Sequence, residues 1–144
     1  MADTPPLFIQ RRVVEFHETD AAGIVHFSNV FLWMESAEMA FLRQRKIPIL
    51  SLSKTGGRGW PRVSVNAQFK SPLRFEDQIE TRLWLGPVGV SSVCYRFEIW
   101  RMSGPGQPTL AATGEMTTVY VTCSMPGGKL EPTRLPPALR RKLK

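Results

Sequence analysis

A loop with the sequence HETDAAGIVHFSN, from His17 to Asn29, places the carboxylate of Asp20 in front of a long apolar segment. The spacing of the apolar residues predicts a helix that begins near Ser28, so Asp20 is too far upstream to be its cap. A free carboxylate can attack a carbonyl carbon or take a proton from water. The alternative is structural, because a short acid often closes an Asx-turn.

The start of the predicted helix supplies a second chemical group. Backbone N–H groups in the first turn of a helix have no intrahelical partner and lie at the positive end of its dipole, so they can stabilise a developing oxyanion. Gly23 lets the backbone bend closely within the loop. A carboxylate beside a helix N-terminus is a minimal arrangement for hydrolysing an activated acyl group.

Other chemistries have less support in the sequence. Metal ligation would have to combine His17 and His26 with Glu18 or Asp20, and no HExxH or CxxC pair supports such a site. The sequence contains no GxGxxG phosphate loop and no GxSxG serine-hydrolase motif. We therefore expect neither a metal ion nor a bound cofactor.

Periodicity predicts the elements that hold the loop. Residues 7–17 have a strand pattern, and residues 28–46 have the pattern of an apolar helix that Pro48 ends. Alternating patterns then predict four more strands, at 62–70, 79–85, 93–99 and 109–123. The predicted fold class is α+β, an antiparallel sheet of about five strands curled around one long central helix, because so apolar a helix needs cover on most sides.

The composition is typical of a single globular domain over residues 1–144, with a core at about 8–124. The net charge is +7, but five basic residues lie in the last eleven positions, so residues 1–133 carry only +2. We expect an irregular basic tail at about 125–144 and no nucleic-acid-binding face. Two cysteines make no disulfide framework and no apolar run could span a bilayer, so we expect a cytoplasmic protein without a membrane partner.

Two segments carry a family resemblance. VEFHETDAAGIVHFSNVFLWMESAE and VSVNAQFKSPLRFEDQIE are similar to the opening strand, loop and helix and to later strands of the 4-hydroxybenzoyl-CoA thioesterase family, which has the hotdog fold. The similarity covers roughly residues 8–124 and is especially close to the aryl-CoA branch, which includes the 1,4-dihydroxy-2-naphthoyl-CoA thioesterases. The resemblance implies an acyl-CoA or aryl-CoA thioesterase for which coenzyme A is part of the substrate.

The resemblance also implies roles for individual residues. Asp20 would be the nucleophile or the general base, and the backbone N–H of Phe27 would polarise the thioester carbonyl. Glu35 matches the position of an acid that contacts an aryl hydroxyl, although a salt-bridged acid at the rim fits equally well, and Glu38 is similarly ambiguous. The other residues expected to line the substrate site are His26, Asn29, Trp60, Ser91 and Ser92.

The resemblance further implies how subunits and CoA are arranged. Family members assemble as dimers or tetramers with each active site shared between subunits, so we expect a homodimer or homotetramer. The phosphates of CoA would be held by Arg58, Arg62 or the basic tail. Two other functions stay open: a non-catalytic hotdog module that binds acyl-CoA or acyl carrier protein, and a hydratase that pairs His17 with Glu38.

Overall fold

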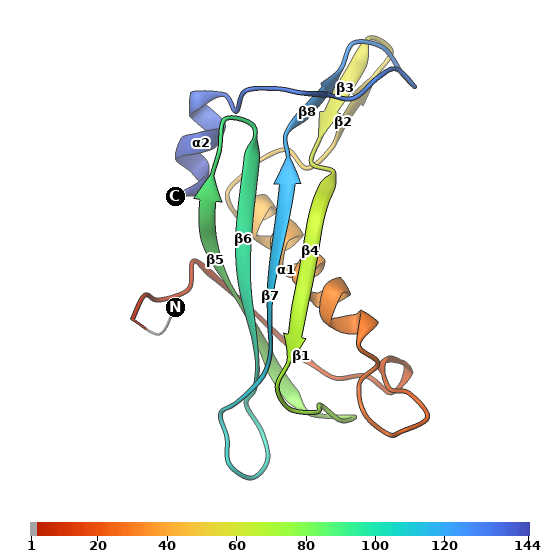
Figure 1. Cartoon of the computed structure of the whole chain (residues 1–144), viewed down its shortest axis with the longest axis vertical. Helices are drawn as coiled ribbons and strands as arrows, with labels where there is room; N and C mark the ends of the chain where they lie inside the picture. The colour runs from red at the N-terminus through yellow and green to blue at the C-terminus, as the bar shows by residue number, and fades with distance from the viewer. Residues whose placement is uncertain (1–2) are drawn as a thin grey trace.

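The protein, seen in a computed structural model that describes residues 3–144, is built from one long helix and a five-stranded antiparallel sheet (Figure 1). Helix α1 spans Ser28–Gln44, and the strands lie in the order β1-β5-β6-β7-β4. Their bounds are β1 Phe8–Val13, β4 Arg62–Phe69, β5 Gln78–Val88, β6 Ser92–Arg101 and β7 Thr109–Val119. The predicted α+β class, with about five strands around one central helix, is confirmed.

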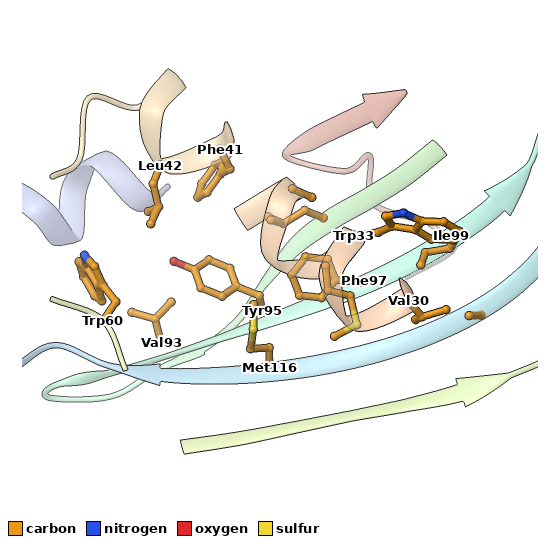
Figure 2. Packing of buried hydrophobic residues seen from close by; sticks show 14 of the residues in the cluster. Val30, Trp33, Phe41, Leu42, Trp60, Val93, Tyr95, Phe97, Ile99 and Met116 are labelled. Carbon is orange, nitrogen blue, oxygen red and sulfur yellow. The ribbon is translucent and has the colours of Figure 1, made fainter. Parts of the chain in front are cut away.

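Helix α1 buries one side against the sheet because its apolar residues recur every three or four positions. Met34 and Phe41 of this helix are buried in one cluster with Tyr95 and Phe97 of β6. Figure 2 shows Phe41 on the helix facing Tyr95 and Phe97 on the sheet. Gly114 on β7 allows the close approach of helix and sheet, since a Cβ atom there would lie 2.7 Å from the sulfur of Met34.

A second, small sheet projects from one end of the main sheet (Figure 1). It consists of β2 Ser51–Ser53, β3 Gly56–Gly59, β8 Val121–Cys123 and β9 Glu131–Pro132. The strand predicted at 109–123 is therefore divided at Tyr120, where the chain passes from the main sheet to the small one. Strands of two to four residues carry too short a pattern to be detected by periodicity.

The prediction of an irregular tail at 125–144 is wrong. Strand β9 pairs with β8, and Pro137–Leu143 form a second helix, α2. Leu135, Leu139 and Leu143 recur every fourth residue, and the first and last of them are only 2% and 0% exposed. The end of the chain therefore completes the hydrophobic core with its leucines, whereas none of its basic side chains is buried.

Strand β4 forms one edge of the main sheet, next to β7. Its apolar face is poorly covered, since Val63, Val65 and Phe69 are 61%, 48% and 54% exposed. Helix α1 packs mainly over β5 and β1, toward the opposite edge. The single chain therefore leaves an apolar sheet edge open to solvent, which favours pairing with another strand.

Membrane contact and metal binding would each need a particular structural feature. Between residues 3 and 144, no helix is both long and apolar enough to cross a membrane. Over the same described stretch, no three His, Cys, Asp or Glu side chains are grouped as metal ligands would be. Cys94 and Cys123 are both free thiols.

Candidate functional site

The loop between β1 and α1 is held in place by Glu18, which lies in a short 3-10 helix, η1 (Phe16–Glu18), and is 4% exposed. Its carboxylate accepts hydrogen bonds from Arg12 Nη2 at 2.9 Å and Trp33 Nε1 at 2.7 Å, and from the backbone N–H of Glu15 at 2.9 Å. Its backbone carbonyl accepts a hydrogen bond from the His26 N–H at 2.9 Å. One residue thus ties both ends of the loop to β1 and α1.

Asp20 lies at the tip of this loop, partly exposed. One oxygen, Oδ1, accepts a hydrogen bond from the Ala22 N–H at 2.8 Å, so the Asx-turn considered from the sequence is present. The other oxygen, Oδ2, accepts no hydrogen bond from the residues that the structure describes, and is free for chemistry. Gly23 has a φ of +80°, the left-handed region that favours glycine, and closes the turn through its N–H to the Asp20 carbonyl at 3.0 Å.

The backbone N–H of Phe27 lies at the start of α1. Phe27 already has helical angles, φ −55° and ψ −31°, and in the described part of the chain its N–H has no acceptor. It therefore remains available to an oxyanion, with the positive end of the α1 dipole behind it. Asp20 and Phe27 line the same cleft of about 450 Å³, together with Phe69 and Leu73; we call it the Asp20 cleft.

The three residues around Phe27 mainly shape the loop. Ser28 is the first residue of α1, and its hydroxyl pairs with Nδ1 of His26 at 2.8 Å. His26 is exposed and its ring packs on that of Phe27, with the centroids 4.6 Å apart. The side-chain amide of Asn29 donates to the Glu18 carbonyl at 2.8 Å. Asn29 thus positions the loop, and His26 lies beside the cleft without lining it.

A second polar group surrounds Glu38, in the middle of α1. Glu38 is fully buried and accepts a hydrogen bond from Arg62 Nη2 at 2.8 Å. Burial raises the pKa of Glu38 to about 7, although the nearby Arg62 lowers it. Glu35, which is 57% exposed, lies 3.7 Å from the same Arg62 nitrogen. Both acids are therefore paired with Arg62, as in the salt-bridged alternative considered from the sequence.

Tyr95 adds an unpaired hydroxyl to this group. Burial, and then the nearby Glu38, raise the pKa of Tyr95. Within residues 3–144, neither the Tyr95 hydroxyl nor Oε2 of Glu38 has a hydrogen-bond partner, and both are buried. Figure 2 shows the Tyr95 ring reaching from the sheet toward α1.

A larger cavity, of about 840 Å³, lies between the second half of α1 and the small sheet. Glu35, Arg62 and Trp60 line it, and the Trp60 indole is fixed by a 2.9 Å hydrogen bond to the Pro48 carbonyl. Asp20 and Phe27 do not reach this space. Glu35 is eight positions after Phe27, about 12 Å along the helix. Within a single chain, the residues of the predicted site are therefore divided between the Asp20 cleft and the large cavity.

Other predicted site residues lie outside both the Asp20 cleft and the large cavity. Ser91 ends the β5–β6 turn and Ser92 begins β6. Their carbonyls accept hydrogen bonds from the N–H groups of Tyr120 and Gly89, and neither serine lines the Asp20 cleft or the large cavity. His17 is exposed and pairs with Glu15 at 3.3 Å, whereas Glu38 is buried against Arg62. The structure does not bring together the His17–Glu38 pair that a hydratase would need.

The sequence profile of the thioesterase-like superfamily matches residues 14–143, which include the loop, α1, the small sheet and every strand of the main sheet except β1. The chain belongs to this superfamily. A protein of Aquifex aeolicus named "Putative esterase" is 45% identical to this member over 78 residues, which cover 53% of this chain and 59% of the relative. The 1,4-dihydroxy-2-naphthoyl-CoA hydrolase of Prochlorococcus marinus is 30% identical over 95 residues, 61% of each chain. These alignments thus span less than two thirds of the relatives' length.

Solved structures of thioesterases share the fold of this superfamily member. The dynemicin thioesterase, whose crystal structures concern polyene binding, is 27% identical and superposes with a TM-score of 0.79 over 94% of both chains. The expected hotdog fold is therefore confirmed, and the match extends beyond the segments on which the resemblance rested.

Sequence reasoning missed Glu18 as the residue that holds the loop. The one available signal was its position two residues before Asp20 in the motif. Its partners Arg12 and Trp33 belong to β1 and α1, so the contacts appear only when the three segments pack together.

Proposed function

We propose that this protein hydrolyses acyl-CoA or aryl-CoA thioesters with Asp20 and the backbone N–H of Phe27. One observation carries the proposal: a carboxylate with a free oxygen and an unpaired helix-start N–H line the same cleft. Membership of the thioesterase-like superfamily supports it.

In the nucleophilic route, Asp20 attacks the thioester carbonyl carbon, and the oxyanion that forms accepts a hydrogen bond from Phe27 N–H. The C–S bond then breaks, CoA leaves as the thiolate, and water hydrolyses the resulting anhydride to restore Asp20. In the general-base route, Asp20 takes a proton from water as that water attacks the same carbon. Both routes need only water besides the thioester, and neither uses a metal ion or cofactor.

The test is steady-state hydrolysis of benzoyl-, hydroxybenzoyl-, dihydroxynaphthoyl- and alkanoyl-CoA by the wild type and by Asp20→Asn. We expect the substitution to lower kcat by at least about 100-fold. Asp77→Asn is the matched control, because Asp77 also closes a turn, accepting from the Arg74 N–H at 2.8 Å, but lines neither space. Full activity of Asp20→Asn, or inertness of every thioester, would refute the proposal.

We further propose that two copies pair through β4 and share their active sites. Strand β4 begins at Arg62, which lines the large cavity, and ends at Phe69, which lines the Asp20 cleft. Two-fold pairing of identical edge strands is antiparallel, so the Phe69 end of one copy meets the Arg62 end of the other. Each Asp20 cleft then faces the large cavity of the second copy, which reunites the divided site. The exposed Val63 and Val65 would be covered in the process.

Mixed dimers test this sharing directly. Asp20→Asn inactivates the cleft, and Gly59→Trp fills the large cavity of its own chain. If sites are shared, each mixed dimer keeps one intact site, and an equimolar mixture regains about a quarter of wild-type activity. If each chain works alone with its own cleft, Gly59→Trp stays active by itself, and mixing the two variants restores no activity beyond that of Gly59→Trp. A CoA substrate and the two free thiols are in keeping with the cytoplasmic location expected from the sequence.

A further inference from the structure

The large cavity has walls that are mainly apolar. Side chains from α1, the small sheet and the segments that flank its strands surround it, among them Met39, Ile49, Leu52, Trp60, Val121 and Leu130. Leu52 and Leu130 are 78% and 57% exposed, so they stand at its opening. Apolar side chains left this open to solvent favour contact with an apolar ligand group.

Glycines of β3 leave this space unfilled. Gly56 and Gly57 lie against the backbone oxygens of Cys123 and Ser51, so neither could carry a side chain without displacing the sheet. A Cβ atom at Gly59, by contrast, would contact only a methyl carbon of Leu50, at 3.6 Å. Gly59 is therefore the position on β3 from which a larger side chain could narrow the cavity.

Of the polar groups beside the cavity, Arg62 is largely engaged and Arg58 has one distant partner. Arg62 donates to Glu38 at 2.8 Å and to the Trp60 carbonyl at 3.1 Å, and it also lies near Glu35. Arg58 reaches the Tyr120 hydroxyl at 3.5 Å. Glu35 and most of the Arg58 guanidinium keep free hydrogen-bonding groups, but both residues are exposed to solvent. A ring with several hydroxyl groups held among the apolar walls would leave hydroxyls unpaired, and unpaired polar groups bind poorly in an apolar site.

The volume favours a long substituent. At roughly 30 Å³ per methylene, close to the volume of a water molecule, a ten-carbon chain needs roughly 300 Å³ and a benzoyl group roughly 200 Å³. The cavity offers about 840 Å³. We propose that it receives the apolar alkyl chain of an acyl thioester, about ten carbons or longer, in preference to a hydroxyaryl group. This inference rests on the proposed thioesterase function and on the pairing that brings Asp20 to the cavity.

The experiment is the dependence of kcat/KM on chain length from butanoyl- to hexadecanoyl-CoA, with benzoyl- and hydroxybenzoyl-CoA alongside. We expect kcat/KM to rise about fourfold per methylene until the chain fills the cavity. Gly59→Leu should lower the ratio of dodecanoyl- to butanoyl-CoA turnover at least tenfold. Val90→Leu, at an exposed position in the β5–β6 turn, should leave that ratio unchanged. If Gly59→Leu does not fold, Met39→Trp narrows the cavity from α1 instead.

The outcomes separate the two proposals. A preference for hydroxybenzoyl-CoA, or no dependence on chain length, would overturn the alkyl-chain inference while the thioesterase function stands. If no thioester is hydrolysed, the proposed thioesterase function is refuted. Calorimetry with dodecanoyl-CoA and hydroxybenzoyl-CoA then measures which of the two ligands the large cavity prefers. Tighter binding of dodecanoyl-CoA, weakened at least tenfold by the narrowing substitution, supports the inference, and equal or weaker binding refutes it.

Discussion

Glu18→Gln tests whether one buried carboxylate positions the catalytic loop. All three groups around the Glu18 side chain are donors: Arg12, the Trp33 indole and the Glu15 N–H. Glutamine has the same shape but offers only one accepting oxygen, and its NH2 group must face at least one of these donors. The substitution therefore removes the ion pair with Arg12 and leaves a buried donor without a partner.

The expected loss of unfolding free energy is about 3 kcal/mol. An unsatisfied buried donor costs about 1–3 kcal/mol, and a hydrogen bond to a charged group contributes about 1.5–3 kcal/mol. The Glu18 side chain is 5% exposed and Arg12 28%, so solvent screens this pair little. For a chain of this length, about 3 kcal/mol corresponds to a fall in Tm of about 10 °C.

Activity gives a second measurement of the same substitution. Because Glu18 holds both Asp20 and the start of α1, a small displacement of one relative to the other should lower kcat by about 10- to 100-fold. Urea unfolding and steady-state kinetics of a tested thioester measure both effects. Glu115→Gln is the matched control, because the Glu115–Arg96 pair at 3.1 Å is half-exposed and should contribute no more than about 1 kcal/mol. If Glu18→Gln behaved like this control in both assays, the positioning role would be refuted.

Three other substitutions test the core, the buried acid and the sheet edge. The pKa of Glu38 is raised from 4.5 to about 7, so the folded state binds the Glu38 proton more tightly than the unfolded state does. The stabilisation that this proton gives is fully present below about pH 4.5 and is lost as the pH rises to about 7. Glu38→Gln should flatten that part of the stability profile in urea unfolding between pH 4.5 and 8, and an unchanged slope would contradict the assignment. Leu143→Ala should lower the unfolding free energy by about 2–5 kcal/mol. The control Arg141→Ala, on the exposed side of α2, should change it by about 0.5 kcal/mol or less. Equal effects of the two substitutions would mean that α2 is not part of the core. Val65→Asp on β4 should shift the protein to monomers in light scattering and abolish activity, and an unchanged mass would exclude β4 as the interface.

The regular elements could be predicted because their signals are local. The apolar residues of α1 repeat at helical spacing within the segment itself, so its start at Ser28 follows from the sequence. The strands of the main sheet alternate over eight residues or more, with β1 the shorter exception. Asp20 and Phe27 could be related for the same reason, since only seven positions separate them.

The C-terminal tail shows how one signal can obscure another. Its leucines repeat every fourth residue, which is a helical pattern, but the prolines and basic residues between them favoured an irregular segment. The burial of Leu135 and Leu143 outweighs that preference, because each buried leucine contributes about 1.5–3 kcal/mol.

The sequence by itself determined the long helix and the strands of the main sheet, the carboxylate and the helix start beside it, because each depends on residues close together in the chain. Only the tertiary structure decided that Glu18 joins Arg12 to Trp33, that Glu38 meets Arg62, and that Asp20 and Glu35 line separate spaces. These contacts join segments far apart in sequence. No periodicity reports them, since they depend on how β1, α1 and β4 are brought together.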